Sequence, residues 1–184
     1  MGRIELIIGC MYSGKTSQLL ILIKRYISIK KNIMVINYLE DTRYGNDNKI
    51  YSHDKNSIEA IPLDNLNKLA IESKYSDQYR EAEIIFINEG QFFDNLLEFT
   101  TNAANNDDKT IIICGLDGDY LRRPFGDMLY LIPHADKVTR LEALCKICGD
   151  GTPGIFTKRI IKTEGQKLIG GDESYIPVCR NHYH

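Results

Sequence analysis

The chain has 184 residues, with 23 basic and 25 acidic side chains and a formal net charge of −2 at pH 7. This length allows one well-packed domain, or a larger domain with a small appendage. The balanced charge excludes a large positive field for a polyanion, so we expect a small anionic substrate and no nucleic acid partner. No apolar run reaches the ~20 residues of a membrane span, and the short start Met1–Arg3 leads directly into a strand pattern; we expect no membrane partner and a cytoplasmic location.

A loop bounded by two glycines follows the first apolar run, Ile4–Ile8. The loop consists of Gly9, Cys10, Met11, Tyr12, Ser13, Gly14, Lys15 and Thr16. This is the spacing of a P-loop, in which backbone N–H groups and the next helix's positive dipole end hold phosphates. Lys15 would reach the β- and γ-phosphates, and the Thr16 hydroxyl would bind Mg²⁺. The motif predicts that the protein binds a nucleoside triphosphate.

Short β-branched runs alternate with helical patterns through the first two thirds of the chain. The expected buried strands are Ile4–Ile8, Ile33–Tyr38, Ile84–Ile87, Thr110–Gly115 and, shorter, Val138–Leu141. The expected helices are Thr16–Ser28, Leu66–Ile71 and a segment with Leu96, Leu97 and Phe99 after Phe93. This order predicts an α/β fold, a P-loop NTPase-like parallel sheet flanked by helices. The polar segment Asp41–Asn56 is expected to be a loop at the sheet's carboxyl edge, where ligands gather.

Two polar residues, Asn88 and Glu89, follow the buried run Ile84–Ile87. They stand where the second phosphate and metal motif of a P-loop enzyme belongs. A carboxylate there accepts the proton of an attacking hydroxyl or water during phosphoryl transfer. An acidic residue at a strand end is often an ordinary surface residue, but the P-loop upstream favours a catalytic role for Glu89.

The composition changes after Leu144 to cysteine, glycine and basic residues with short β patterns. We therefore expect two parts, a nucleotide-binding domain over residues 1–142 and a small β module over residues 143–184. Within the module, Ile155–Ile161 and Gln166–Ile169 can pair as a ribbon, and Gly170–Ser174 is typical of a turn or loop.

The five cysteines are an odd set that does not fit a secreted disulfide framework. Cys145 and Cys148 form one pair with two intervening residues, and Cys179 forms another with His182. Together they make a Cys₃His set, which is complete for tetrahedral zinc and leaves no open position, so the metal is expected to be structural. The spacing favours His182 over His184. The alternative is three buried free cysteines and an exposed terminal histidine.

Several short motifs occur together and in one order along residues 4–183. They are the loop Gly9–Thr16, Asp41-Thr42-Arg43, Glu89-Gly90-Gln91-Phe92-Phe93, Leu116-Asp117-Gly118, Arg123-Pro124-Phe125-Gly126, the two zinc pairs, and Ile169-Gly170-Gly171 with Tyr175. This combination resembles the cellular and poxvirus type of thymidine kinase. The resemblance implies transfer of the γ-phosphate of ATP to the 5′-hydroxyl of thymidine, and of deoxyuridine, to give the monophosphate in nucleotide salvage.

The same resemblance implies roles for individual residues. Glu89 matches the general base. The residues expected at ATP and Mg²⁺ are Gly9, Cys10, Met11, Tyr12, Ser13, Gly14, Lys15, Thr16, Asp41, Arg43 and Asn88. The residues expected at the nucleoside, some of them on a lasso loop that extends from the zinc module, are Met11, Phe92, Leu116, Tyr120, Phe125, Thr157, Leu168, Ile169, Gly170, Gly171 and Tyr175. The family also implies a homotetramer and feedback inhibition by dTTP.

Three residues depart from the family pattern. Asn88 replaces the usual Asp, which removes a charge near the metal and is expected to weaken Mg²⁺ binding. Cys10 replaces the usual proline and is expected to bring a thiol near the phosphates, and Tyr120 replaces a usual Phe. From the residues alone, Phe92 and Phe125 also suit core packing.

Other functions remain compatible with the motifs. One is a P-loop ATPase whose zinc ribbon binds nucleic acid, against which the near-neutral charge argues. Another is a regulatory nucleotide-binding protein that has lost catalysis through Asn88. Among nucleosides, hydrogen bonds to O4 and N3–H of the base would favour thymine and uracil over cytosine.

Overall fold

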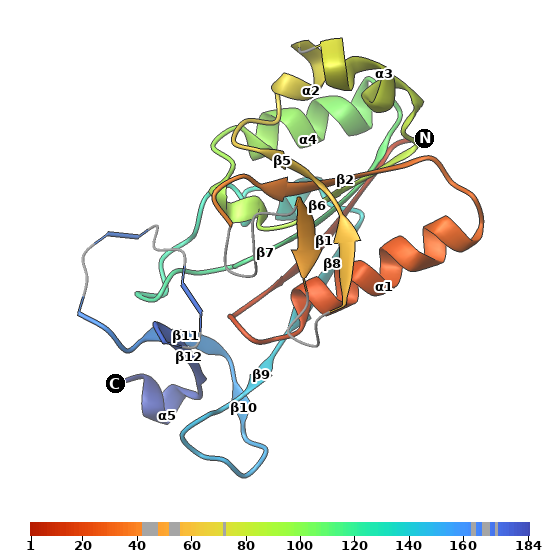
Figure 1. Cartoon of the computed structure of the whole chain (residues 1–184). Coiled ribbons are helices and arrows are strands. Elements are labelled where there is room, and N and C mark those ends of the chain that lie inside the picture. Colours follow the sequence, from red (N-terminus) through yellow and green to blue (C-terminus); the bar gives the residue numbers. More distant parts are fainter. Residues whose placement is uncertain (42–47, 52–55, 72, 163–164, 167–169, 172) are drawn as a thin grey trace.

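The computed structural model describes residues 1–41, 48–51, 56–71, 73–162, 165–166, 170–171 and 173–184. A central sheet carries helices on both faces, and a smaller group of strands lies beside its carboxyl edge (Figure 1). The sheet has six strands in the order β5-β2-β6-β7-β1-β8, and all neighbouring strands are parallel. The expected α/β fold with a parallel sheet is confirmed.

The strands of this sheet are β1 (Arg3–Gly9), β2 (Ile33–Tyr38), β5 (Ile61–Leu63), β6 (Ile84–Ile87), β7 (Thr110–Gly115) and β8 (Lys137–Leu141). The sequence predicts all of these except β5. This three-residue strand lies at the sheet edge and contains Pro62, which cannot donate a ladder hydrogen bond and is tolerated there.

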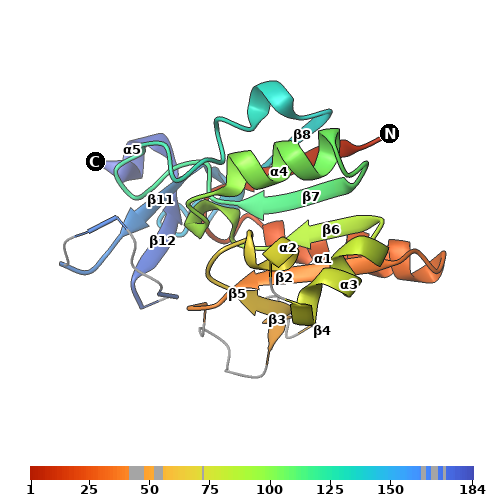
Figure 2. The ribbon, with the colours of Figure 1, turned by 90° about the horizontal axis from the view of Figure 1, so that it is seen from above.

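The helices cover both faces of the sheet. They are α1 (Lys15–Ser28), α2 (Lys68–Ile71), α3 (Ser73–Glu81), α4 (Leu96–Asn105) and the terminal α5 (Arg180–Tyr183), with 3₁₀ turns at Gly90–Phe92 and Ile132–His134. Because strand side chains alternate, Leu6 packs in the core with Phe99 of α4, and Ile7 packs with Leu19 of α1 on the other face. Figure 2 shows the sheet between α1 and α4.

The segment between β2 and β5 departs from the prediction of one continuous loop. Lys49–Tyr51 forms β3, which pairs antiparallel with β4 (Ser57–Glu59). Ile50 of β3 is fully buried with the residues of α1. One apolar residue in a polar run is too weak a pattern to predict a strand. Residues 42–47 and 52–55, which include Arg43, lie outside the described residues.

The C-terminal part contains two short antiparallel pairs. β9 (Ala143–Leu144) pairs with β10 (Pro153–Gly154), and β11 (Phe156–Arg159) pairs with β12 (Tyr175–Val178). The predicted pairing of Ile155–Ile161 with Gln166–Ile169 is therefore wrong. β12 is the partner because it buries Tyr175 and Val178, whereas the half-buried Gln166 makes polar contacts elsewhere and residues 167–169 lie outside the described residues.

Among the described helices, we find none with the length and apolarity required to cross a membrane.

Candidate active site

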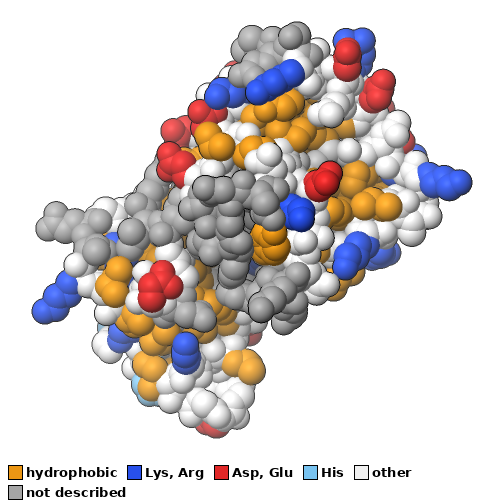
Figure 3. Space-filling model, in the orientation of Figure 1, with side chains coloured by type: hydrophobic (Ala, Val, Ile, Leu, Met, Phe, Trp, Pro, Cys, Tyr) orange, Lys and Arg blue, Asp and Glu red, His pale blue; other side chains and the backbone are white. Residues whose placement is uncertain are grey.

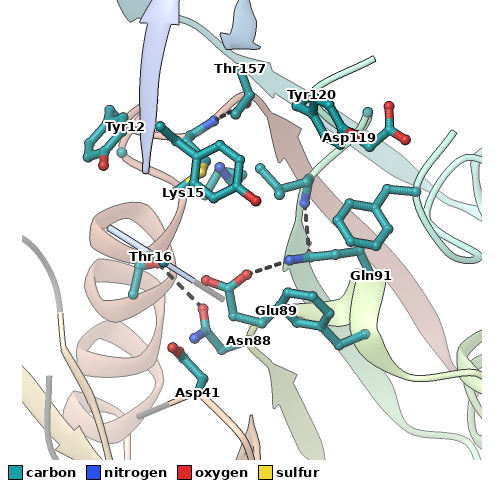
Figure 4. Close-up of a pocket in the computed structure, with 18 of the residues that line it drawn as sticks. Tyr12, Lys15, Thr16, Asp41, Asn88, Glu89, Gln91, Asp119, Tyr120 and Thr157 are labelled. Atoms are coloured by element: carbon teal, nitrogen blue, oxygen red, sulfur yellow. Dashed lines mark hydrogen bonds between the residues drawn. The ribbon is translucent and has the colours of Figure 1, made fainter. Parts of the chain in front are cut away.

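One pocket opens where the carboxyl ends of the central strands meet the C-terminal strands (Figure 4). Its empty space amounts to about 910 Å³ when the open solvent at its mouth is included. The predicted site residues that line it are Met11, Tyr12, Gly14, Lys15, Thr16, Asp41, Asn88, Glu89, Phe92, Leu116, Tyr120, Phe125, Thr157, Gly170 and Tyr175. Residues from six separate stretches of the chain thus meet in one place.

Other predicted residues lie elsewhere. Gly9, Cys10, Ser13 and Gly171 are not among the described residues that line the pocket, and Arg43, Leu168 and Ile169 lie outside the described part. The pocket also contains residues that were not predicted as site residues, namely Ser17, Tyr51, Gln91, Gly118, Asp119 and Gln166. Gln91, Gly118 and Asp119 follow strands of the sheet, which is the sequence pattern that points to them.

The loop between β1 and α1 begins with a close approach of two backbones. Gly9 has φ +147°, and a Cβ there would collide with the carbonyl oxygen of Leu141 in β8. The loop then folds over Lys15, whose Nζ donates to the carbonyl oxygen of Cys10 at 2.6 Å and to Ser13 Oγ at 3.5 Å. Burial lowers the pKa of Lys15, and the negative charge of Glu89 opposes that shift. A bound phosphate stabilises the charged form of such a buried lysine more than that of an exposed one.

The Cys10 side chain turns away from the pocket. It is 2% exposed, and its thiol donates to the carbonyl oxygen of Gly154 in β10 at 3.1 Å. Burial raises the pKa of this thiol. The next residue, Met11, donates its backbone N–H to Thr157 Oγ1 in β11 at 3.0 Å. The expected thiol beside the phosphates is thus replaced by a structural contact, and the loop is hydrogen-bonded to the C-terminal strands at two successive residues.

Asn88 forms a buried network of neutral groups beside α1. Its Oδ1 accepts hydrogen bonds from Thr16 Oγ1 at 3.5 Å and from Cys114 Sγ at 3.0 Å. Its Nδ2 donates to Asn37 Oδ1 at 2.8 Å. Asp41 lines the pocket on the same side as Thr16 and Asn88 (Figure 4). Hydroxyl, amide and carboxylate oxygens are the donors that Mg²⁺ prefers, so these residues fit such an ion.

Glu89 places a buried carboxylate at the centre of the pocket (Figure 4). The residue is 8% exposed and has φ +56°, a left-handed conformation that non-glycine residues rarely adopt. Its Oε2 accepts a hydrogen bond of 2.6 Å from Gln91 Nε2. Backbone strain of this kind is often found at functional sites, and here it is combined with a short hydrogen bond at the carboxylate.

Aromatic side chains form the opposite wall. Phe92 and Phe125 meet edge to face, with ring centroids 5.5 Å apart, and Phe92 also stacks on Tyr38 at 5.0 Å. Both phenylalanines are mostly buried and both line the pocket, so core packing is compatible with the predicted contact to a ligand. The guanidinium of Arg159 lies 3.7 Å from the ring centre of Tyr120, which fixes that ring by a cation–π contact.

The C-terminal residues close this side of the pocket. Gln166 Nε2 donates to Asp119 Oδ2 at 3.0 Å and to the carbonyl oxygen of Pro124 at 3.2 Å. The Tyr183 hydroxyl donates to the carbonyl oxygen of Tyr120 at 2.7 Å. The segment after β7 is thereby held against the residues around β11, β12 and α5.

Cys145, Cys148, Cys179 and His182 form a Cys–His cluster behind this wall. Their ligand atoms all lie within 4.8 Å of one another. The Cys148 and Cys179 sulfur atoms are 3.8 Å apart, and His182 Nδ1 lies 3.3 to 3.6 Å from the three sulfur atoms. A zinc tetrahedron with bonds of about 2.3 Å has sulfur–sulfur edges of about 3.8 Å, so the cluster fits zinc. It contains His182, as the spacing favours.

A buried lysine facing a buried carboxylate at the carboxyl edge of a parallel sheet is typical of a phosphotransferase. The family model described as thymidine kinase matches residues 2–183. The chain belongs to the thymidine kinase family.

Known thymidine kinases are similar over almost the whole chain. That of Yaba monkey tumor virus is 41% identical over 179 residues, which cover 97% of this chain and 93% of the viral protein. That of Sheeppox virus is 42% identical over 182 residues, covering 99% and 97%. Thymidine kinase a of Arabidopsis thaliana is 41% identical over 183 residues, covering 99% of this chain and 75% of the plant protein. Viral and plant members thus match at similar identity.

Proposed function

We propose that the protein transfers the γ-phosphate of ATP to the 5′-hydroxyl of thymidine, and also of deoxyuridine. The observation that carries this proposal is the single pocket in which Lys15 and Thr16 stand on one side of Glu89 and the aromatic wall stands on the other. Membership of the thymidine kinase family supports it independently. A phosphate donor and an apolar base would then meet at the Glu89 carboxylate.

The triphosphate would be held by the loop from Gly9 to Thr16. Lys15 now donates to the Cys10 carbonyl, and phosphate oxygens would replace that acceptor. The Thr16 hydroxyl, Asn88 Oδ1 and Asp41 would hold Mg²⁺ directly or through water, and Arg43 would lie near the transferring phosphate, as in the family. When bound, Mg²⁺ would offset negative charge on the β- and γ-phosphates.

Glu89 would act as the general base. The proton of the nucleoside 5′-hydroxyl would move to its carboxylate while the hydroxyl oxygen forms the new bond to phosphorus. The bond from phosphorus to the β,γ-bridging oxygen would break, and its electron pair would leave with ADP. Lys15 supports this role because a buried ammonium beside the carboxylate favours the ionised form of Glu89.

The thymine base would lie between the aromatic wall and the C-terminal residues. Phe92 and Phe125 offer apolar faces, and Thr157, Gly170 and Tyr175 approach from the other part of the chain. Leu168, Ile169 and Gly171 would complete a lasso over the base, as in the family. We thus propose a working division into residues 1–142, which hold ATP, and residues 143–184, which cover the nucleoside.

The Cys–His cluster would hold a structural zinc ion. It has four ligands and so leaves no position for a substrate. The cluster joins the strands around β9 to the chain end after β12, between which the nucleoside-covering residues lie. Fixing both ends of that segment lowers the entropy cost of ordering it over a substrate.

Regulation and assembly are proposed from the family. dTTP would inhibit by placing its base in the nucleoside pocket and its phosphates at the loop, since both lie in one cavity. The homotetramer is proposed from membership of the family alone. Basic and acidic side chains lie interspersed over the face in Figure 3, which supports a small substrate in place of nucleic acid.

The test is direct detection of monophosphate from thymidine, deoxyuridine or deoxycytidine with ATP over a Mg²⁺ titration. We expect product from thymidine and deoxyuridine, and much less from deoxycytidine. Binding of ATP without any phosphorylated nucleoside would contradict the proposal and favour a regulatory role. ATP hydrolysis stimulated by DNA or RNA, and lost steeply with added salt, would favour the nucleic-acid-binding alternative.

A further inference from the structure

Gln91 connects the Glu89 carboxylate to the end of β7. Its side chain is 1% exposed, and both ends of its amide are bonded. Nε2 donates to Glu89 Oε2 at 2.6 Å, and Oε1 accepts the backbone N–H of Leu116 at 3.0 Å. We propose that Gln91 is a positioning residue that aims the Glu89 carboxylate at the acceptor hydroxyl. This inference rests on the proposed function, in which Glu89 is the base.

The orientation of the amide is set by the backbone. A backbone N–H can only donate, so the group that faces Leu116 must be the acceptor Oε1. The donor Nε2 then necessarily faces Glu89. The reversed amide would bring two donors together at Leu116 and two acceptors together at the carboxylate. Gln91 therefore presents a hydrogen-bond donor to Glu89 and fixes the direction of that carboxylate oxygen.

Two glycines lie close to Gln91. A Cβ on Gly115 would lie 2.7 Å from Gln91 Oε1, so the side-chain amide occupies space that exists because residue 115 has no side chain. A Cβ on Gly126 would collide with the backbone carbonyl oxygen of Gln91. The absence of these two side chains leaves room for the amide and for the backbone that carries it.

The backbone of Glu89 provides the second fixed point. Its φ of +56° starts the 3₁₀ turn Gly90–Phe92, and its carbonyl oxygen accepts the N–H of Phe92 at 3.1 Å. The strained backbone fixes where the side chain starts, and Gln91 fixes where one of its oxygens ends. A carboxylate held at both ends is preorganised for proton transfer, in which small misplacement costs rate.

The test compares Gln91→Met, which keeps the length of the side chain and removes both polar groups, with Met128→Leu, a volume-conserving change in the core beside Gly115. The measurement is kcat and KM for thymidine, KM for ATP and the melting temperature. For Gln91→Met we expect kcat to fall about tenfold, because the carboxylate is no longer held in one direction, and KM for thymidine and for ATP to stay within about twofold. Met128→Leu is expected to keep the kinetics of the unmodified enzyme.

Gly115→Ala covers the case in which Gln91→Met does not fold. Its Cβ would push Gln91 Oε1 away while the amide itself is kept, so kcat is expected to fall by a smaller factor with both KM values unchanged. An unchanged kcat in a folded variant, or a loss that falls on KM alone, would overturn the inference. Glu89→Gln separates the two ideas: an inactive Glu89→Gln enzyme beside a fully active Gln91→Met enzyme contradicts the role of Gln91 alone, whereas an active Glu89→Gln enzyme contradicts the proposed function as well.

Discussion

Asn88 and Asn37 form a buried amide pair, in which Asn88 Nδ2 donates to Asn37 Oδ1 at 2.8 Å. This bond turns Asn88 Oδ1 toward Thr16, so a neutral oxygen acceptor faces the place where Mg²⁺ would bind. The pair avoids a buried charge while keeping an oxygen ligand in position. A neutral amide thus stands where the resemblance to the family implies a carboxylate.

Asn88→Asp is expected to strengthen metal binding. An ionised carboxylate beside Thr16 adds a negative charge at the metal, and Asn37 can turn its own N–H₂ toward the new acceptor. We expect the Mg²⁺ concentration for half-maximal activity to fall about three- to tenfold. The same charge change at the exposed Asn105 of α4 is the control and is expected to leave the Mg²⁺ requirement unchanged. An equal requirement in both variants would argue against metal binding at Asn88.

Glu89→Gln is expected to reduce turnover by about 10²- to 10⁴-fold, because the amide cannot accept the proton of the hydroxyl. ATP binding should persist, as measured by a fluorescent analogue. The negative charge of Glu89 raises the pKa of Lys15, so its removal should lower the pKa of Lys15 further. Glu98→Gln on the exposed face of α4 is the matched control, with unchanged kinetics. Normal turnover in Glu89→Gln would remove Glu89 from the base role.

Lys15→Met is expected to abolish turnover and to stabilise the nucleotide-free protein. Burial lowers the pKa of Lys15 below 10.5, so the unfolded chain holds this proton more tightly than the folded one. The contribution of Lys15 to stability is thus lowest at neutral pH and below, and it rises as the pH increases from the folded pKa toward 10.5.

Thermal unfolding at neutral pH is the measurement for this variant, with an expected rise of about 2–4 °C in melting temperature. Lys24→Met, on the exposed side of the same helix, is the control and should change the melting temperature by less than about 1 °C. A clear drop in the melting temperature of Lys15→Met would show that the hydrogen bond to the Cys10 carbonyl outweighs the cost of burying the ammonium.

His182→Asn is expected to lose the metal, and His184→Asn to keep it, because His182 Nδ1 lies 3.3 Å from Cys148 Sγ within the Cys–His cluster. Zinc content by atomic absorption distinguishes the two variants. For His182→Asn we also expect KM for thymidine to rise about tenfold or more, since the residues that cover the nucleoside lose their anchor. Full zinc content and an unchanged KM in His182→Asn would contradict a structural zinc site.

The sheet can be predicted from the sequence because its central strands are buried on both faces. Ile84–Ile87 and Thr110–Gly115 are continuous β-branched runs, and such runs stand out from polar surroundings. β3 has three residues and one buried side chain, so local pattern does not mark it. Pro177 weakens the strand pattern of β12. The pairing of β12 with β11 joins residues that are separated in the chain by positions 160–174.

The candidate site divides in a similar way. The loop and Glu89 can be found from spacing because each belongs to a contiguous motif next to a predicted strand. The role of Gln91 cannot be found in this way, because it depends on the N–H of Leu116, which lies 25 residues away. The direction of the Cys10 thiol likewise depends on Gly154, which lies 144 residues away. Local sequence patterns do not predict contacts between residues so far apart in the chain.

The two hydrogen bonds that join the phosphate loop to the C-terminal strands have a thermodynamic consequence. Cys10 bonds to Gly154, and Met11 bonds to Thr157, so movement of β10 and β11 on nucleoside binding would also move the loop. The affinities for the two substrates would then be linked, and linkage is reciprocal. Thymidine would change the dissociation constant of ATP by the same factor by which ATP changes that of thymidine.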